Sequence, residues 1–153
     1  MPAQHPDDDS LQDMVTHIFY SFGKTLGQLH DYGLSHGRPA MRDITYDPDT
    51  DKITLLDWEN GRRWPELTPQ GWDLLIFVHS YLREDNLPIS YLYAMMNGYS
   101  SARTAHDTVL HVKEILRKRE CLFKFCRMLN PFHFVDTEAA VKAYDFMLAL
   151  KTE

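Results

Sequence analysis

The spacing of apolar residues predicts one long amphipathic helix near the start of the chain. From residue 11 to residue 29, apolar side chains recur every three or four positions, as they do along one face of a helix. Ser10 is followed three residues later by Asp13, which is typical of a helix N-terminus, and Gly33 is placed to cap the C-terminus. We therefore expect the first helix to run from about Ser10 to about Gly33.

The pattern then changes to a short β unit. Two strand-like runs, ITY and KITLLDW, flank the sequence DPDTD at residues 47–51, and proline and aspartate favour turns. Helical spacing returns after this unit. It predicts four further helices, over about residues 69–84, 89–100 and 106–129 and from Asp136 onward, with Gly98 ending the second of them. The expected fold class is mainly α with a small β-hairpin.

Composition indicates a single globular domain. The 153 residues are 44% hydrophobic and 25% charged, so we expect an acidic tail at residues 1–10 and one domain over residues 11–153. The net charge of -6 does not attract nucleic acid, and we expect no nucleic-acid partner. The N-terminus lacks a secretory pattern, and no apolar run approaches the ~20 residues that span a bilayer. We therefore expect a cytoplasmic protein without a transmembrane segment.

Several reactive residues in the C-terminal half have a structural interpretation. Cys121 and Cys126 are five residues apart, a spacing that fits neither a redox pair nor a zinc site, so we expect two buried, reduced thiols. His106 and His111 are also five residues apart and would not share a helix face. We expect these histidines and Asp107 to have capping or surface roles.

The predicted helix over residues 106–129 also carries a basic run. Its members alternate with apolar residues and are Lys113, Arg117, Lys118, Arg119, Lys124 and Arg127. We interpret the run as the solvated face of a helix. The alternative is a patch for an anionic lipid, a sugar phosphate or a partner helix, which Arg62 and Arg63 could join. Three tryptophans are expected to pack in the core and to cover the neighbouring loop: Trp58, Trp64 and Trp72.

Candidate chemistry lies in two short segments, SHGRPAMRD at residues 35–43 and LLDWE at residues 55–59. The first is a polar loop after the long helix and ends in Asp43. The second is a strand end that delivers Asp57 fourteen residues later. This order resembles the C-terminal lobe of the protein-kinase-like fold, especially the bacterial lipopolysaccharide kinase and aminoglycoside phosphotransferase branch.

In that branch the catalytic loop reads His-Gly-Asp-Leu-x-x-x-Asn, and a strand ending in Ile-Asp-Trp/Phe-Glu follows it. His36 and Gly37 match the start of the loop, Asp43 stands at the Asn position, and Asp57 matches the metal-binding aspartate. Asp73, in GWDLL, resembles the buried aspartate that supports the loop from the following helix. The resemblance implies Mg²⁺ and ATP as cofactors, and phosphoryl transfer to a sugar, lipid-linked sugar or protein hydroxyl.

The metal-binding candidates are carboxylates. Phosphoryl transfer depends on positioning and on charge neutralisation by Mg²⁺, which takes one or two carboxylates together with phosphates and waters. Asp43 and Asp57 could supply two carboxylates. Glu59 is a candidate third ligand, because alternate residues of a strand lie on the same side. Aspartate at the Asn position keeps an oxygen donor but adds a negative charge, which would weaken phosphate binding.

Arg38 departs from the family pattern, because it stands where these enzymes place the aspartate that acts on the acceptor hydroxyl. A guanidinium cannot act as a base near neutral pH, although it could bind an anionic group. In a shifted alignment, Arg42 and Asp43 would be the Arg-Asp pair of the protein-kinase loop. Pro48 would then take the metal-binding position, which argues against that alignment.

The sequence contains no recognisable kinase N-lobe. Only ten residues precede the first predicted helix, and the seven glycines are scattered, so the glycine-rich loop and strand lysine that cover nucleotide phosphates are missing. We expect a protein-kinase-like C-lobe without the N-lobe, in which phosphotransfer is impaired unless a protein partner supplies that lobe. The alternative is a catalytically inactive, pseudokinase-type binding or regulatory module for a protein partner or an anionic small molecule.

Overall fold

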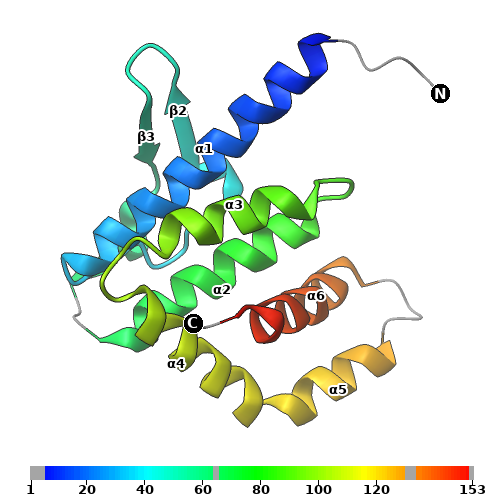
Figure 1. Ribbon diagram of the computed structural model, residues 1–153. Helices are drawn as coiled ribbons and strands as arrows, with labels where there is room; N and C mark the ends of the chain where they lie inside the picture. The colour runs from blue at the N-terminus through cyan, green and yellow to red at the C-terminus, as the bar shows by residue number, and fades with distance from the viewer. Residues whose placement is uncertain (1–5, 64–65, 130–133, 152–153) are drawn as a thin grey trace.

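The computed structural model describes residues 6–63, 66–129 and 134–151. Within them the protein is mainly helical with a small antiparallel hairpin, as the sequence predicts (Figure 1). The helices are α1 (Pro6–Asp31), α2 (Leu67–Arg83), α3 (Ile89–Tyr99), α4 (Ala105–Lys118), α5 (Glu120–Leu129) and α6 (Val135–Ala149). The hairpin consists of β2 (Ile44–Asp47) and β3 (Lys52–Leu55), and a second short pair consists of β1 (Leu34–Ser35) and β4 (Arg62–Arg63).

The side chain of Asp47 stabilises the hairpin turn. Strands β2 and β3 pair antiparallel, and the Asp47 carboxylate accepts hydrogen bonds from the Asp49 N–H (3.0 Å) and the Thr50 hydroxyl (2.6 Å). Side-chain bonds of this kind are the reason that aspartate favours turns. The hairpin predicted from the sequence is therefore confirmed together with its local cause.

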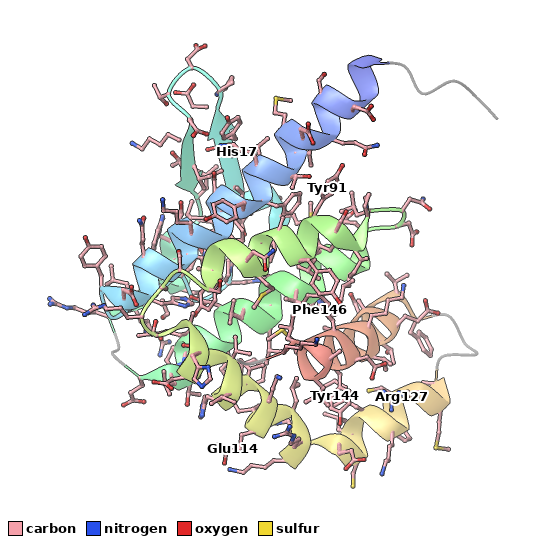
Figure 2. All side chains as sticks on the ribbon, viewed as in Figure 1. His17, Tyr91, Glu114, Arg127, Tyr144 and Phe146 are labelled. Carbon is pink, nitrogen blue, oxygen red and sulfur yellow. The ribbon has the colours of Figure 1, made fainter. Side chains whose placement is uncertain are left out.

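Helix α1 begins at Pro6, earlier than the predicted cap at Ser10, so Ser10 lies inside the helix. At the other end Gly33 has a positive φ of 71°, as predicted for a glycine C-cap. His17 extends from α1 to the hairpin turn, where its Nε2 lies 2.7 Å from Oδ1 of Asp51 (Figure 2). This contact ties the hairpin to the side of α1.

Helices α1 and α3 cross in close contact, and glycines permit it (Figure 1). Gly23 lies against the Met95 backbone and Gly98 against the Tyr20 carbonyl, so a Cβ at either glycine would overlap the opposite helix. Gly98 lies near the end of α3, where the sequence places it, but it has no positive φ. Its role is close packing of two helices and not the termination of one.

The apolar pattern over residues 106–129 is divided between two helices, so five helices follow the hairpin in the described residues, where four are predicted. The chain turns at Arg119, whose backbone is not helical (φ −109°, ψ 16°). Helix α4 packs against α2 and helix α5 against α6, and this turn lets each helix face its own partner. Asp136 lies in the first turn of α6 and not at its cap, and it pairs with Arg83 (3.2 Å).

Helix α5 keeps apolar side chains on its outer side. Leu122, Phe125 and Met128 are 54%, 55% and 72% exposed. Cys121 is exposed and Cys126 is half-buried, and both are free thiols. The prediction of two buried thiols is wrong, because the described part of the chain does not cover this face of α5.

Helix α2 lies at the centre of the fold, packed against α4 and α6. Leu74, Phe77 and Val78 have no exposed surface, and neither does Asp73 on the same helix. A buried carboxylate in an apolar helix requires hydrogen-bond donors around it. No helix in the described ranges is long and apolar enough to cross a membrane.

Candidate functional site

The loop at residues 35–43 is fixed by Asp73 of α2. Oδ2 of Asp73 accepts a hydrogen bond from the His36 N–H (2.6 Å), and Oδ1 accepts one from the Gly37 N–H (2.8 Å). Because Asp73 has no exposed surface, leaving either donor unpaired would be costly. Gly37 has φ 88°, and a Cβ there would overlap the Asn60 backbone, which explains the glycine.

A second layer of buried polar groups holds Asp73 in place. Nε2 of His30 lies 3.2 Å from Oδ2 of Asp73, and Nδ1 of His30 lies 2.7 Å from the Tyr99 hydroxyl. Burial raises the pKa of Tyr99, so the phenol keeps its proton and donates to Nδ1, while Nε2–H donates to Asp73. The Gln70 side-chain amide donates to the His30 carbonyl (2.9 Å). Hydrogen bonds thus connect α1, α2 and α3 beneath the loop.

The loop and the end of β3 are joined through both backbone groups of Leu56. The Leu56 N–H donates to the Asp43 carbonyl (2.7 Å), and the Leu56 carbonyl accepts from Nε2–H of His36 (2.7 Å). With Nε2 donating, Nδ1 of His36 is buried without a partner among the described residues. Trp58 covers the His36 ring at a centroid distance of 4.8 Å. Asp57 follows Leu56 directly, so the loop fixes the backbone that carries this aspartate.

Asp57 adopts a left-handed backbone conformation (φ 61°, ψ 59°). Aspartate and asparagine adopt it more often than other non-glycine residues, and Asp51 and Asn86 also have positive φ in this structure. After Asp57 the chain enters a 3-10 turn, Trp58–Asn60. The argument that placed Glu59 on the same side as Asp57 is wrong, because strand β3 ends at Leu55 and strand alternation does not reach Glu59.

Asp43 turns its carboxylate into the loop. The residue is almost fully buried, its Oδ2 accepts from the Ala40 N–H (3.0 Å), and its Oδ1 lies 3.6 Å from Nε of Arg42. The carboxylate thereby closes the 3-10 turn Met41–Asp43. A general base must reach the acceptor hydroxyl, so this burial argues against the shifted alignment in which Asp43 is the base.

The structure does not gather three metal-binding side chains at this site. Among the described residues, no group of three or more His, Cys, Asp or Glu side chains is arranged to hold a metal ion. Asp43, Asp57 and Glu59 therefore do not form a three-carboxylate site. The hydrogen bond from the Leu56 N–H to the Asp43 carbonyl brings the backbones of Asp43 and Asp57 close together, while the Asp43 carboxylate faces the Ala40 N–H inside the loop.

Arg38 lies on the wall of an open groove beside the loop. The groove has a volume of about 720 Å³ and is lined by Ser35, Gly37, Arg38, Asn60, Arg62, Glu66, Thr68, Pro69, Trp72 and Ile76. Arg38 and Arg62 are exposed, and neither side chain has a hydrogen-bond or ion-pair partner in the part of the chain that the structure describes. Asp43 and Asp57 do not line the groove, so it is separate from the pair of aspartates.

The tryptophans do not pack in the core as expected. Trp58 and Trp72 are 45% and 41% exposed, the first over His36 and the second in the groove. Trp64 lies outside the described residues. The expected cover for the loop is therefore provided by Trp58.

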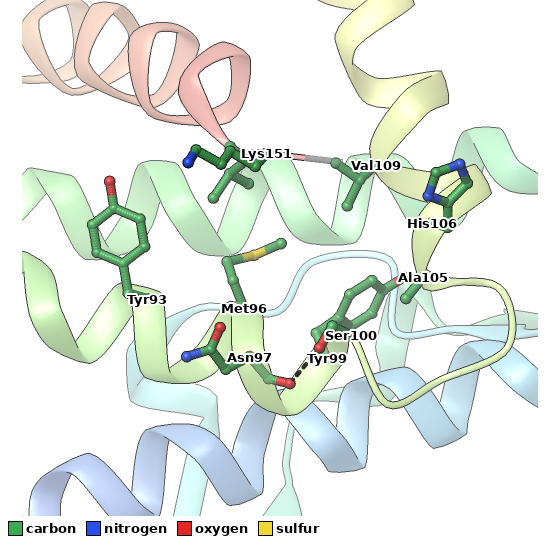
Figure 3. A pocket seen from close by; sticks show the side chains of 10 residues that line it. Tyr93, Met96, Asn97, Tyr99, Ser100, Ala105, His106, Val109 and Lys151 are labelled. Atoms are coloured by element: carbon green, nitrogen blue, oxygen red, sulfur yellow. Dashed lines mark hydrogen bonds between the residues drawn. The ribbon is translucent and has the colours of Figure 1, made fainter. Parts of the chain in front are cut away.

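Another pocket, of about 380 Å³, is lined by residues of α3 and α4 and by the residues after α6 (Figure 3). Tyr93, His106 and Lys151 surround it, and none of them belongs to the predicted site. His106 is exposed, and His111 bonds through Nε2 to the Thr68 hydroxyl (2.9 Å). Neither histidine takes part in a metal-binding group of described residues.

Half of the basic run on α4 and α5 is paired with nearby acids, as expected of a solvated face. The pairs are Lys118 with Glu114, Lys124 with Glu120, and Arg127 with Asp145 of α6. Arg117 and Arg119 form no ion pair with an acid among the described residues, and Lys113 is buried and donates to the Leu150 carbonyl. Its ammonium group secures the end of α6 and is not part of a surface patch.

The sequence did not reveal the roles of His30 and Tyr99. They lie 69 residues apart on different helices, and no local pattern connects them. The one usable signal is that His30 follows Leu26 by four residues, which puts a polar ring on the buried face of the predicted helix. A buried histidine needs a polar partner, but its identity depends on the tertiary fold.

Comparison with known proteins identifies relatives but not a family. No family model matches the chain. An uncharacterized protein of Haemophilus influenzae is 38% identical over 91 residues, which cover 55% of this chain and 34% of that protein. Two proteins named probable bifunctional tRNA threonylcarbamoyladenosine biosynthesis protein are each 26% identical. The match to the one from Methanocorpusculum labreanum covers 58% of this chain and 16% of the relative, and the match to the one from Haloquadratum walsbyi covers 67% and 19%. The chain thus spans about a third or less of each relative.

Proposed function

We propose that this chain is the C-lobe part of a kinase-like phosphotransferase that binds Mg²⁺ and ATP at Asp43 and Asp57. It would transfer a phosphoryl group to a hydroxyl of a sugar, a lipid-linked sugar or a protein. The observation that carries the proposal is the pair of hydrogen bonds through Leu56. They join the end of the loop to the end of β3, so two aspartates fourteen residues apart in sequence occupy neighbouring backbone positions.

The residues of this chain would act mainly by positioning. Phosphoryl transfer requires little covalent help from protein, and a bound Mg²⁺ neutralises phosphate charge. Asp57 would hold that ion together with Asp43, whose carboxylate would have to turn from the Ala40 N–H toward the ion, while His36 and Asp73 keep loop and strand end in place. Arg38 cannot remove a proton from the acceptor, but it could neutralise an anionic group there. We therefore expect slow transfer.

A complete nucleotide site needs groups that this sequence does not show. In kinases a glycine-rich loop and a lysine of the N-lobe cover the phosphates, and the seven glycines here are scattered. The chain also spans about a third or less of its matched relatives. We propose that a partner protein or a further segment supplies the missing groups.

The second candidate is a pseudokinase-type module that binds a partner or a small anion without chemistry. Arg38 favours it, because the family pattern places a carboxylate there and the guanidinium lies free in an exposed groove. The hydrogen bonds that hold the loop would then serve only to bind that partner or anion. A test for nucleotide and a test for an anion in the groove separate the two candidates.

The printed name of two relatives connects those proteins with tRNA modification. The matched part is less than a fifth of each of them, so their names do not determine the role of this segment. The net charge of -6 also gives no general attraction for RNA. A tRNA-related role remains secondary to the phosphotransferase proposal.

Thermal unfolding with Mg²⁺ and ATP tests the proposal. Binding to the folded state alone should raise the melting temperature, by about 3 °C for each 1 kcal/mol of linkage. Asp57→Asn should abolish the rise, because asparagine tolerates the left-handed backbone but lacks the charge. Glu59→Gln is the matched control and should keep it. No rise in the wild type at millimolar ligand would refute nucleotide binding.

A further inference from the structure

We propose that the groove beside the loop binds an anionic sugar, a molecule that combines a phosphate or carboxylate group with a sugar ring. Calling this ligand the phosphoryl acceptor rests on the proposed function, whereas the binding itself does not. The proposal follows from the charges, the aromatic surface and the hydroxyl-binding groups that meet in one groove.

The first support is a pair of free cations. Arg38 of the loop and Arg62 of β4 line the same groove. They are brought together by strand pairing, in which Ser35 lies opposite Arg62, and by the close contact of Gly37 with Asn60. Arg83 and Arg127, for example, pair with aspartates, whereas Arg38 and Arg62, like Arg63 and Arg117 outside the groove, have no partner among the described residues. Two guanidinium groups in one groove suit a phosphate or carboxylate.

One acid shares the groove and does not neutralise it. Glu66 lines the same groove as Arg38 and Arg62, but it forms no ion pair with either of them. The formal charge of the lining residues is therefore +1 from two arginines and one glutamate. An uncharged ligand would gain nothing from this charge, and a cation would be repelled by it.

The second support is an aromatic surface. Trp72 is 41% exposed and forms part of the groove lining. Arg119 lies 5.8 Å from the centre of its ring, a cation–π contact that favours one orientation of the indole. A large apolar ring next to hydrogen-bonding groups suits the C–H face of a sugar better than it suits a bare inorganic anion.

The third support is the remaining polar lining. Asn60 is exposed and its amide has no partner in the described ranges, so it can both donate to and accept from sugar hydroxyls. The volume of about 720 Å³ falls in the range of ordinary small-molecule sites. The groove therefore has room for a monosaccharide with an anionic group and not only for an ion.

Isothermal titration calorimetry without nucleotide tests this proposal. The ligands are glucose 6-phosphate and glucuronate as anionic sugars, glucose as the neutral ring, and inorganic phosphate as the anion without a ring. We expect an anionic sugar to bind with a Kd of about 1 mM or lower, and glucose and phosphate to bind at least about tenfold more weakly.

Variants locate the binding. Arg38→Gln and Arg62→Gln should each weaken binding of the anionic sugar about tenfold, because each removes a charge-assisted contact. Arg63→Gln is the matched control, since Arg63 neighbours Arg62 in β4 but does not line the groove, and it should bind like the wild type. All three side chains are exposed, so the melting temperature should not change.

Three results would overturn the proposal. These are no saturation by either anionic sugar up to about 20 mM, equal affinity for phosphate and the anionic sugars, or equal losses in Arg63→Gln and Arg38→Gln. Binding of an anionic sugar without any effect of Mg²⁺ and ATP on unfolding would refute the phosphotransferase and keep the groove site. A rise in melting temperature with Mg²⁺ and ATP, without binding of either anionic sugar, would refute the groove site alone.

Discussion

The two sides of the loop at residues 35–43 differ in how their polar groups are satisfied. On the inner side, the N–H groups of His36 and Gly37 donate to the buried Asp73, which also contacts His30. On the outer side, Arg38 is exposed in a groove and has no partner among the described residues. The inner contacts therefore account for the conformation of the loop, and the outer groups are the ones available to a ligand.

This difference predicts where substitutions act. A buried donor that loses its acceptor is left without any hydrogen bond, which destabilises the folded state. An exposed charge keeps its contact with water in both states. Changes on the inner side should therefore reduce stability, and changes on the outer side should reduce binding with little effect on stability.

Asp73→Ala should have the largest effect, because it leaves two backbone N–H groups and the His30 ring without their acceptor. We expect a loss of about 3–5 kcal/mol in the free energy of unfolding, measured by urea denaturation. Asp85→Ala, at an exposed position after α2, is the control and should cost less than about 0.5 kcal/mol. Equal losses in the two variants would show that Asp73 does not hold the loop.

Tyr99→Phe removes one hydroxyl from the deepest part of the network. Nδ1 of His30 would lose its donor in a site with almost no exposed surface, while the packing of the ring would be kept. We expect a loss of about 1–2 kcal/mol by the same measurement. Tyr93→Phe, on an exposed face of α3, should be neutral. An unchanged stability in Tyr99→Phe would mean that this hydrogen bond is not formed in solution.

Asp31 is intermediate in burial between the inner and outer groups. Its half-buried carboxylate joins the end of α1 to the residues before α4. Burial alone would raise the pKa of Asp31, but hydrogen bonds from Arg103 and Thr104, with the Arg103 charge, outweigh it and lower the pKa. The stabilisation is therefore present above the ordinary value of 3.8 and is lost as the pH falls through the lower folded value. The wild type should exceed Asp31→Asn by about 1 kcal/mol at pH 7, and the difference should shrink as the pH falls below 3.8. A difference that is independent of pH would contradict this assignment.

Arg38→Gln should have the smallest effect on stability, within about 0.5 kcal/mol of the wild type, because the side chain is exposed and unpaired. The same variant should lose affinity for anionic sugars, and this combination marks the outer side of the loop. A loss of stability as large as that of Tyr99→Phe would remove the distinction between the two sides.

Local chemistry made part of this structure predictable. The Asp47 turn, the Gly33 cap and the order of loop and strand end all follow from short stretches of sequence. The turn at Arg119 and the packing role of Gly98 do not, because they depend on which helix lies opposite. Long-range partners decide such features, and one sequence does not specify them locally.

The geometry of the loop was predictable only in part. The sequence singled out His36, Asp43, Asp57 and Asp73 as candidates. In the structure Asp73 bonds the His36 N–H, and both His36 and Asp43 bond the backbone of Leu56, next to Asp57. The sequence did not show that the Asp43 carboxylate faces inward or that the chain leaves strand geometry before Glu59. Both depend on backbone conformation at a few residues, which residue types alone do not fix.

The central claim is that the loop end and the strand end together hold a divalent ion with nucleotide. Substoichiometric Mn²⁺ in place of Mg²⁺, added with ATP, broadens the NMR signals of the nearest backbone amides first. We predict first loss at residues 41–43 and 56–58, and no such loss in Asp57→Asn. Broadening centred on the acidic hairpin turn at residues 47–51, and unchanged in Asp57→Asn, would contradict the claim.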